Sequence, residues 1–334
     1  MINLVTGSVP RGPDYFGRND FIRRLWDQLE KDHVLLTAPR RFGKTGAMFR
    51  LLDQPREPYR PIYIDLEHLA SPADFMVELL ATLRRDSHFA RAVNGLWNET
   101  KQAGSHLRGL ASRVDLGSLK VYLREQTDVA QQWRAYGERV MQTLADDGPR
   151  LLLMLDEFAI LVHQAAQRDL EELKQFLRWF RAARIAPDTK TRFLVGGSIN
   201  LVSTLDAVGL VDTVNDFAIQ RLGSFDTQTA REFIQAVSES QGVELPAEVQ
   251  DCIIDTLGSP IPYLLSVLLT AVFDQHRTSG SPITPALVQG QRTLSGFASK
   301  ELHQEVHAPA GHAAFHDVAL LAGMLLDQAQ CQAT

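Results

Sequence analysis

The chain has 334 residues, of which 45% are hydrophobic and 22% charged, and its net charge is −6 at pH 7. This composition is ordinary for a globular protein of one large or two modest domains, and the acidic balance excludes a general role in coating nucleic acid, so that any nucleic-acid contact would be local. The distant pair Cys252 and Cys331, an N-terminus without a signal-like apolar run, and a longest apolar segment of only residues 263–273 predict a cytoplasmic protein without membrane contact.

The first predicted elements are a helix and a strand. Apolar positions within residues 21–29 fall on one face of a helix. The helix is followed by Val34–Thr37, an apolar run without polar alternation, which predicts a short buried strand.

A loop with the spacing of a phosphate-binding motif follows this strand. Residues 38–45 read Ala-Pro-Arg-Arg-Phe-Gly-Lys-Thr and lead into a helix that begins near Thr45. Strand, loop and helix in this order let loop amides and the positive helix end converge on phosphate oxygens. Lys44 can reach the β- and γ-phosphates, and the Thr45 hydroxyl suits Mg²⁺.

The loop departs from the common GxxxxGK[ST] pattern at its first position, where Ala38 replaces glycine. The chain must therefore turn with a Cβ present, which requires a negative φ at Ala38. The alternative interpretation of residues 38–45 is a basic surface turn between a core strand and a core helix.

The second strand is predicted over residues 61–66 and carries an acid near its end, at Asp65. We favour a role for Asp65 as the N-cap of the next helix. The alternative is that its carboxylate reaches a metal or water shell.

A mainly helical insertion is predicted next. Residues 72–112 have helical patterning, and residues 133–144 predict a further helix. Between them, a Gly-Ser pair at positions 117 and 118 separates short β-like runs and predicts a small hairpin over residues 114–123. We therefore expect residues 85–135 to be a helical and hairpin insertion in the core.

A second acidic site follows a strand of five consecutive apolar residues, 151–155, which is typical of a strand buried on both faces. Asp156 and Glu157 follow directly, at the edge of an open α/β sheet where ligands bind. Asp156 is expected to hold Mg²⁺, directly or through water, and Glu157 to act as general base on the attacking water. The alternative, a solvated acidic loop, is disfavoured by the phosphate-type loop upstream.

Residues 170–183 predict an amphipathic helix with a basic face. The arginines on or just after it are Arg178, Arg181 and Arg184. One of them could act as an arginine finger, but we favour the interpretation of a solvated basic face.

The fourth strand is predicted over residues 192–197 and ends in two glycines. Ser198 and Asn200 follow it. Either side chain could sense a γ-phosphate or cap the next helix, and the pattern favours neither role.

A fifth strand is predicted over residues 217–222, and from Asp226 onward the pattern is wholly helical. This change predicts an α/β core over residues 1–222 and a helical lid over residues 223–300. Residues 301–334 are expected to be a C-terminal helical segment that could begin a winged helix.

Histidines at helical spacing occur in this last segment. They form two pairs one turn apart, His303 with His307 and His312 with His316. Pro309 separates the pairs and no cysteine joins them, so we do not expect a metal site there.

Together these motifs resemble P-loop ATPases of the AAA+-related STAND class, and most closely the archaeal-type ATPases, over roughly residues 14–275. The matching motifs are Phe16-Gly17-Arg18, Pro39-Arg40-Arg41-Phe42-Gly43-Lys44-Thr45, Leu155-Asp156-Glu157-Phe158, Gly197-Ser198 and Gly258-Ser259-Pro260-Ile261-Pro262-Tyr263. In this family the arginine pair of the loop is a more specific signature than the generic motif.

The resemblance implies an α/β P-loop NTPase (AAA+-like) fold, a parallel sheet core with a C-terminal α-helical lid. The implied nucleotide contacts are Phe16, Gly17, Arg18, Pro39, Arg40, Arg41, Phe42, Gly43, Lys44, Thr45, Gly46 and Pro262. The implied catalytic residues are Lys44, Glu157 and Ser198, and the implied metal ligands are Thr45 and Asp156. The cofactors are then ATP or ADP and Mg²⁺.

These residues predict a Mg²⁺-dependent ATPase that works as a molecular switch, with a protein partner or self-association as its output and slow turnover without that partner. A guanine-reading NKxD motif is absent from the sequence, which favours adenine. The alternative is a nucleotide-stabilised DNA- or protein-binding module with little hydrolysis. A kinase-like transferase is disfavoured because the sequence shows no second-substrate pocket.

Overall fold

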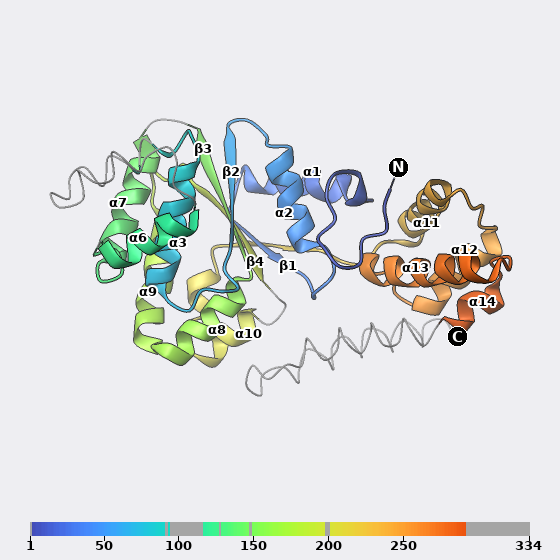
Figure 1. Cartoon of the computed structure of the whole chain (residues 1–334). Coiled ribbons are helices and arrows are strands. Elements are labelled where there is room, and N and C mark those ends of the chain that lie inside the picture. The colour runs from blue at the N-terminus through green and yellow to red at the C-terminus, as the bar shows by residue number, and fades with distance from the viewer. Residues whose placement is uncertain are drawn as a thin grey trace. The chain divides into compact units, whose positions relative to one another are not determined.

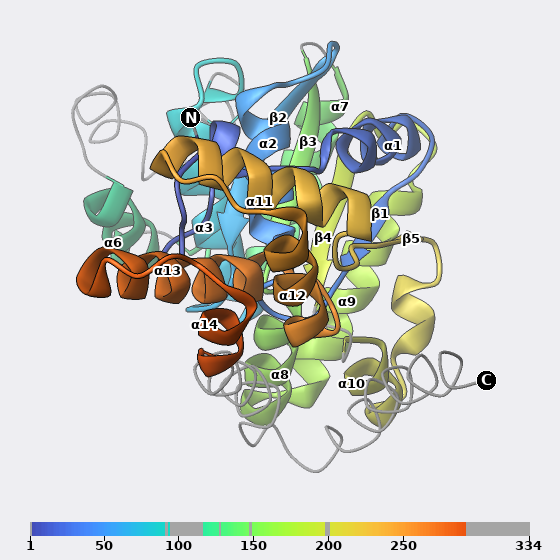
Figure 2. The same cartoon turned by 90° about the vertical axis from the view of Figure 1, so that its right-hand side faces the viewer.

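The computed structural model describes residues 2–90, 93, 116–126, 128–146, 149–197 and 201–291. It divides into two compact units. Figures 1 and 2 show its helices and strands, coloured along the chain. Of the described residues, unit 1 comprises 2–25, Leu36–Asp53 and 220–291, and unit 2 comprises Trp26–Leu35 and those that lie between 54 and 219. The predicted domain boundaries at residues 222 and 300 stay predictions.

A five-stranded sheet runs through the α/β part of the chain in the order β2-β3-β4-β1-β5. Its strands are β1 (Val34–Thr37), β2 (Tyr59–Asp65), β3 (Arg150–Asp156), β4 (Arg192–Gly197) and β5 (Ala218–Arg221). β3 pairs in parallel with β2 on one side and with β4 on the other. Residues 151–156 are all buried, so the prediction of a central strand buried on both faces is confirmed.

Helices of unit 2, labelled in Figure 1, contribute aromatic side chains to a buried core. They are α3 (Pro72–Arg85), α6 (Leu116–Gln126), α7 (Trp133–Asp146), α8 (Phe158–Arg168), α9 (Leu170–Ile185), α10 (Leu201–Ala207) and the 3₁₀ turn η2 (Val211–Val214). Phe75 of α3 lies edge-on to Phe176 of α9, with ring centroids 5.2 Å apart. Trp133 of α7 contacts Trp179 of α9 in the same manner, at 5.9 Å.

Unit 1 contains the helix that follows the phosphate-type loop and the all-helical part of the chain. Its elements are η1 (Gly12–Asp14), the start of α1 (Asn19–Leu29), α2 (Lys44–Asp53), α11 (Thr227–Gln241), α12 (Ala247–Leu257), α13 (Pro262–Ser279) and α14 (Pro285–Gly290). The Asp226 carboxylate caps α11 by accepting a hydrogen bond from Thr229 N at 2.7 Å. The predicted change to a wholly helical pattern at Asp226 is confirmed through residue 291.

The N-terminal leader belongs to the helical core of unit 1. Ile2, Leu4 and Phe16 pack against that core. The rings of Phe16 and Phe233 lie 5.6 Å apart. The leader thus brings the segment around Phe16 to the helices of the C-terminal part.

The predicted hairpin over residues 114–123 is wrong. Residues 116–126 form helix α6, which includes the glycine and serine that were expected to turn the chain. Leu119 and Leu123 are buried one helical turn apart, and α6 packs on α3. Tertiary burial of this leucine face outweighs the local turn preference of the Gly-Ser pair.

The predicted capping role of Asp65 is also wrong. The N-cap of α3 is Ser71, whose hydroxyl accepts a hydrogen bond from Asp74 N at 3.1 Å. The Asp65 carboxylate instead accepts from Glu67 N at 3.0 Å. Residues 66–70 intervene before α3 begins, so Asp65 closes a local turn at the end of β2 and is too far from the helix to cap it.

Among the described helices, none has the length and the apolar character needed to cross a bilayer.

Candidate functional site

The loop at residues 38–43 joins the buried strand β1 to helix α2. Gly43 has a φ of 98° and Arg41 a φ of 65°. Within the described part of the chain, the other non-glycine residue with a positive φ is Glu157. Ala38 therefore turns without a positive φ, as predicted, and the left-handed backbone of the loop falls at Arg41 instead.

Lys44 is the first residue of α2 and is only 7% exposed. Its ammonium donates hydrogen bonds to the carbonyl oxygens of Ala38, at 2.9 Å, and Pro39, at 3.3 Å. Main-chain carbonyl oxygens of the loop thus contact the ammonium directly. A positive charge at a helix N-terminus adds to the positive end of the helix dipole, so this arrangement favours a bound anion.

The Tyr15 ring packs on Gly43 of this loop and on Gly46 of α2. A Cβ at Gly46 would lie 2.5 Å from the Tyr15 ring, and a Cβ at Gly43 would lie 3.2 Å from it. Any side chain at position 46 would displace the ring. Gly46 of α2 is thus required by the close packing of the Tyr15 ring against it, and its predicted contact with a nucleotide stays a prediction.

Two buried polar groups beside the loop have no hydrogen-bond partner among the residues that the structure describes: Tyr15 Oη and Arg50 Nε. Tyr15 is 5% exposed, and burial raises the pKa of its hydroxyl despite the charges of Arg18 and Arg50. Arg50 Nη2 donates to the Tyr15 carbonyl oxygen at 3.4 Å. Sequence reasoning missed both groups, because nothing in the pattern around Tyr15 shows whether its hydroxyl finds a partner.

The side chains of Phe16 and Arg18 pack into the helical part of unit 1. The Arg18 guanidinium is buried, donates to Gly223 O at 2.7 Å and lies 4.6 Å from the centre of the Phe225 ring. Gly17 has a φ of 68°, and a Cβ there would lie 2.5 Å from Thr229 Cγ2. The side chains of this motif therefore hold the segment in place, and its predicted contact with a nucleotide stays a prediction.

The remaining predicted contacts lie on the loop and at the start of α13. Pro39, Arg40, Phe42 and Thr45 are half-buried, and Thr45 is the second residue of α2. Pro262 is the first residue of α13. The guanidinium of Arg41 lies 4.7 Å from the centre of the ring of Tyr263, the next residue.

In unit 2, β3 ends at Asp156, which is 2% exposed. Its Oδ1 accepts a hydrogen bond from Glu157 N at 3.0 Å, and its Oδ2 accepts one from the Tyr63 hydroxyl at 3.3 Å. The alternative of a solvated acidic loop is therefore wrong for Asp156. The Tyr63 pKa is raised by burial and by the negative charge of Asp156, so this phenol stays a hydrogen-bond donor.

Glu157 connects β3 to α8 with a left-handed backbone, φ 54° and ψ 35°. Its side chain is half-buried and does not cap α8. Non-glycine residues in this conformation occur often at functional sites, where the strain fixes the direction of a side chain. Tyr63 was missed by sequence reasoning, although its strand pairs in register with β3 up to Asp65 and Asp156.

Several predicted residues lie outside the described part of the chain. They are Ser198, Asn200, His303, His307, His312 and His316. β4 itself is described to its end at Gly197. Within the described residues, there is no group of three or more His, Cys, Asp or Glu side chains that could hold a metal ion.

Neither interpretation of the arginines of α9 holds for Arg184, whose side chain is fully buried. Its Nε and Nη2 donate to the Asp216 carboxylate at 2.7 and 2.8 Å. Its guanidinium lies between the rings of Phe180, at 4.5 Å, and Phe217, at 4.3 Å. Arg184 is thus a core residue, and its partner lies too far along the chain to be seen in the helical pattern.

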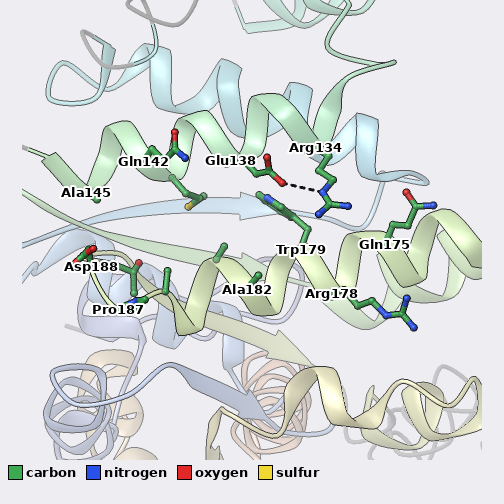
Figure 3. A pocket seen from close by; sticks show the side chains of 14 residues that line it. Arg134, Glu138, Gln142, Ala145, Gln175, Arg178, Trp179, Ala182, Pro187 and Asp188 are labelled. Carbon is green, nitrogen blue, oxygen red and sulfur yellow. Dashed lines mark hydrogen bonds and ion pairs between the residues drawn. The ribbon is translucent and has the colours of Figure 1, made fainter.

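Arg178 lines a cavity of about 470 Å³ between α7 and α9 (Figure 3). Trp179 forms part of its wall, and Arg134 and Glu138 form an ion pair at 3.0 Å along its rim. A Cβ at Gly137 would lie 2.5 Å from the Trp179 ring, so this glycine lets α7 approach α9. The described residues that line the cavity include none of the predicted nucleotide or metal contacts.

The chain is similar in structure to a Walker-type ATPase from Pyrococcus abyssi, with a TM-score of 0.58 and 19% identity over 92% of this chain and 80% of that one. It is also similar to the ORC2 protein of Aeropyrum pernix, solved as ADPNP–ADP complexes, with a TM-score of 0.57 and 14% identity over 91% of this chain and 73% of that one.

Models of known protein families and the sequences of curated proteins give no match. The structural likenesses and the sheet confirm the predicted fold class: the chain has the α/β P-loop ATPase fold of the AAA+ type, with a helical C-terminal region. The STAND class within that fold stays a prediction.

Proposed function

We propose that this chain is a Mg²⁺-dependent ATPase of the AAA+ type that works as a molecular switch. The observation that carries the proposal is Lys44, a nearly buried ammonium at the N-terminus of α2, wrapped by the loop that follows β1. The ammonium and the positive helix end reinforce each other. A polyphosphate neutralises both, and the loop amides supply directed hydrogen bonds to it.

The polar groups beside the loop fit a nucleotide. Tyr15 Oη and Arg50 Nε are buried donors without a hydrogen-bond partner among the described residues. Buried donors in native proteins are nearly always satisfied, and the exceptions call for an explanation. A nucleotide carries many acceptor oxygens and nitrogens, so it can supply the missing partners if the leader adjusts around it.

Thr45 and Asp156 would hold Mg²⁺ in this proposal. Mg²⁺ at nucleotide sites takes one or two protein oxygens and completes its shell with water and phosphate oxygens. A hydroxyl and a carboxylate are therefore a sufficient protein contribution. When bound, the ion neutralises charge on the β- and γ-phosphates.

Glu157 is the proposed general base. Its left-handed backbone and its position next to Asp156 at the end of β3 support this role. The Glu157 carboxylate accepts a proton from the water that attacks the γ-phosphorus, and the bond to the β-phosphate oxygen breaks as the new bond forms. Ser198 is proposed to contact the γ-phosphate after β4.

The switch follows from the loss of phosphate contacts. Lys44 and the loop amides bind a triphosphate more strongly than a diphosphate, so hydrolysis removes the contacts that favour one conformation. We propose that a partner protein, or a second copy of the chain, reads this difference. The nucleotide complexes of the ORC2 protein support nucleotide binding in this fold.

Phosphate release by three proteins tests the proposal. Lys44→Ala removes charge-assisted hydrogen bonds to phosphate, and we expect ATP affinity to fall about 100-fold. Glu157→Gln keeps the shape and loses the base, so we expect affinity within about twofold of wild type and phosphate release at least about 100-fold slower.

The matched controls are Lys31→Ala and Glu125→Gln, which change exposed residues of the same types. Both are expected to hydrolyse ATP as wild type does. Tight, Lys44-dependent binding with no hydrolysis would favour the nucleotide-stabilised binding module. Equal phosphate release by all five proteins would remove Lys44 and Glu157 from the mechanism.

A further inference from the structure

We propose that Tyr263 is a positioning residue for the phosphate-binding loop, acting through the guanidinium of Arg41. The inference rests on the proposed nucleotide function and adds to it a specific link between the loop and the start of α13. Loop, leader and α13 all belong to unit 1.

The backbone of Arg41 is strained. Its φ of 65° lies in the left-handed region, which is unfavourable for a residue with a Cβ and costs glycine nothing. The loop therefore carries a strained arginine where glycine would relieve the strain. Such a conformation persists only when surrounding interactions hold it, which points to the arginine side chain as the group that is held.

The Arg41 side chain is held by the aromatic ring of Tyr263. Tyr263 presents its ring to the Arg41 guanidinium, with 4.7 Å between the guanidinium carbon and the ring centre. This distance is within the range of a cation–π contact. Arg41 is exposed and Tyr263 half-buried, so the fixed partner of the pair is the ring.

The start of α13, which carries the Tyr263 ring, is packed against the rest of unit 1. Tyr263 follows Pro262 at the start of α13 and precedes Leu264 and Leu265, both buried. The turn before the helix is tied to the start of α11 by a hydrogen bond from Phe225 N to Pro260 O at 3.0 Å. The Tyr263 ring is therefore anchored to the packed helical core of unit 1 by the residues on either side of it.

Holding the Arg41 side chain also affects the direction of the amides that follow Arg41. Gly43 has a φ of 98°, so left-handed residues flank Phe42. Runs of main-chain N–H groups in such turns form concave anion sites, and their direction depends on each backbone angle. By holding Arg41, Tyr263 pre-orders the loop that receives the phosphates and keeps a second cation near Lys44.

A double-mutant cycle on the full-length chain tests the inference, with ADP affinity measured by titration calorimetry. Tyr263→Leu removes the aromatic face, and we expect ADP to bind about two- to fivefold more weakly. Tyr263→Phe keeps the face and should bind ADP as wild type does. In the Arg41→Gln background, which lacks the cation, Tyr263→Leu should cause no further loss.

A merely structural role for Tyr263 would give other results. Equal losses for Tyr263→Leu and Tyr263→Phe, or the same loss from Tyr263→Leu with and without the Arg41 cation, would overturn the inference. Wild-type affinity in Tyr263→Leu would overturn it as well.

Amide hydrogen exchange without nucleotide separates this inference from the proposed function. We expect the amides of residues 41–43 to exchange about two- to fivefold faster in Tyr263→Leu than in wild type, and at the wild-type rate in Tyr263→Phe. Failure of wild type to bind ADP would refute the proposed function alone. Unchanged exchange at residues 41–43 would refute the positioning role, whatever the nucleotide affinity.

Discussion

Two of the buried cations, Arg184 in unit 2 and Lys44 in unit 1, have different surroundings. Arg184 in unit 2 is 2% exposed, is paired with the Asp216 carboxylate and lies between two aromatic rings. Lys44 in unit 1 is 7% exposed and donates to the neutral carbonyl oxygens of Ala38 and Pro39 at the start of a helix. The Arg184 charge is paired with a carboxylate in the core, and the Lys44 charge lies at a helix N-terminus, where the helix dipole favours a bound anion.

The ionisation and hydrogen bonding of the groups in the two units can also be compared. Beside Arg184, burial alone would raise the pKa of Asp216, but the hydrogen bonds and charge of Arg184 lower it, so the pair stays ionised. In unit 1, the buried polar groups Tyr15 Oη and Arg50 Nε lack hydrogen-bond partners among the described residues, and in unit 2 the same holds for Nη1 of Arg184. A buried cation paired with a carboxylate is expected to be structural, and a cation at a helix N-terminus is expected to favour an anion.

The largest effect is expected from breaking the completed pair. Arg184→Met removes the hydrogen-bonded partner of the Asp216 carboxylate and leaves the weaker contact with Arg181 Nε at 4.0 Å, and we expect the free energy of unfolding to fall by about 3–5 kcal/mol. Urea unfolding measures this change. The control is Arg178→Met, an exposed position on the same helix, which should change stability by less than about 0.5 kcal/mol. Equal effects from the two variants would show that the pair is not a structural unit.

The pH dependence of stability probes the same region through His33. This buried ring accepts a hydrogen bond from Phe193 N at Nδ1, at 3.2 Å, and its Nε2 lies 2.9 Å from Arg184 O. Burial lowers its pKa, as do the charges of Arg192 and Arg184, while the hydrogen bond to Arg184 O and the charge of Asp216 oppose the shift.

The sign of the effect follows from proton uptake. Below about pH 6.5 the unfolded chain protonates this histidine and the folded chain does not, so stability is lost as the pH falls, with a slope of up to about 1.4 kcal/mol per pH unit. His33→Gln should remove this slope between pH 6.5 and the lowered pKa of the folded state. His88→Gln, at an exposed position, should retain it. An unchanged slope in His33→Gln would mean that the ring takes up a proton in the folded state.

The smallest effect is expected from Tyr15→Phe, and its sign is informative. Removing a buried hydroxyl without a partner should raise the free energy of unfolding by about 1 kcal/mol in the absence of nucleotide. If the nucleotide supplies the missing acceptor, the same variant should bind ADP about tenfold more weakly. Thermal unfolding with and without ADP measures both changes. Lower stability without nucleotide would show that the hydroxyl already has a partner in the folded chain.

Local patterns predicted the framework of this protein well. The apolar run before Asp156 and the strand–loop–helix order around Lys44 depend on residues that are adjacent in sequence, and the structure has both as expected. The helix over residues 116–126 was missed because burial against α3 decides its conformation.

Contacts between distant segments could not be predicted from these patterns. Asp216 as the partner of Arg184, Tyr63 as a donor to Asp156 and the Tyr263 ring under Arg41 each join segments that no periodicity connects. The buried Tyr15 hydroxyl belongs to the same class, because burial of one atom has no sequence signature. The sequence therefore indicates which chemistry is present, and the fold determines which groups are already paired.

Amide hydrogen exchange with and without a non-hydrolysable ATP analogue and Mg²⁺ tests the central claim most directly. We expect strong protection of the amides of residues 40–46 in wild type, none at these residues in Lys44→Ala, and no change around Arg184 in either protein. Exchange at residues 40–46 that is unaffected by the analogue, or equal protection in Lys44→Ala, would contradict the claim that this loop and its buried lysine bind a triphosphate.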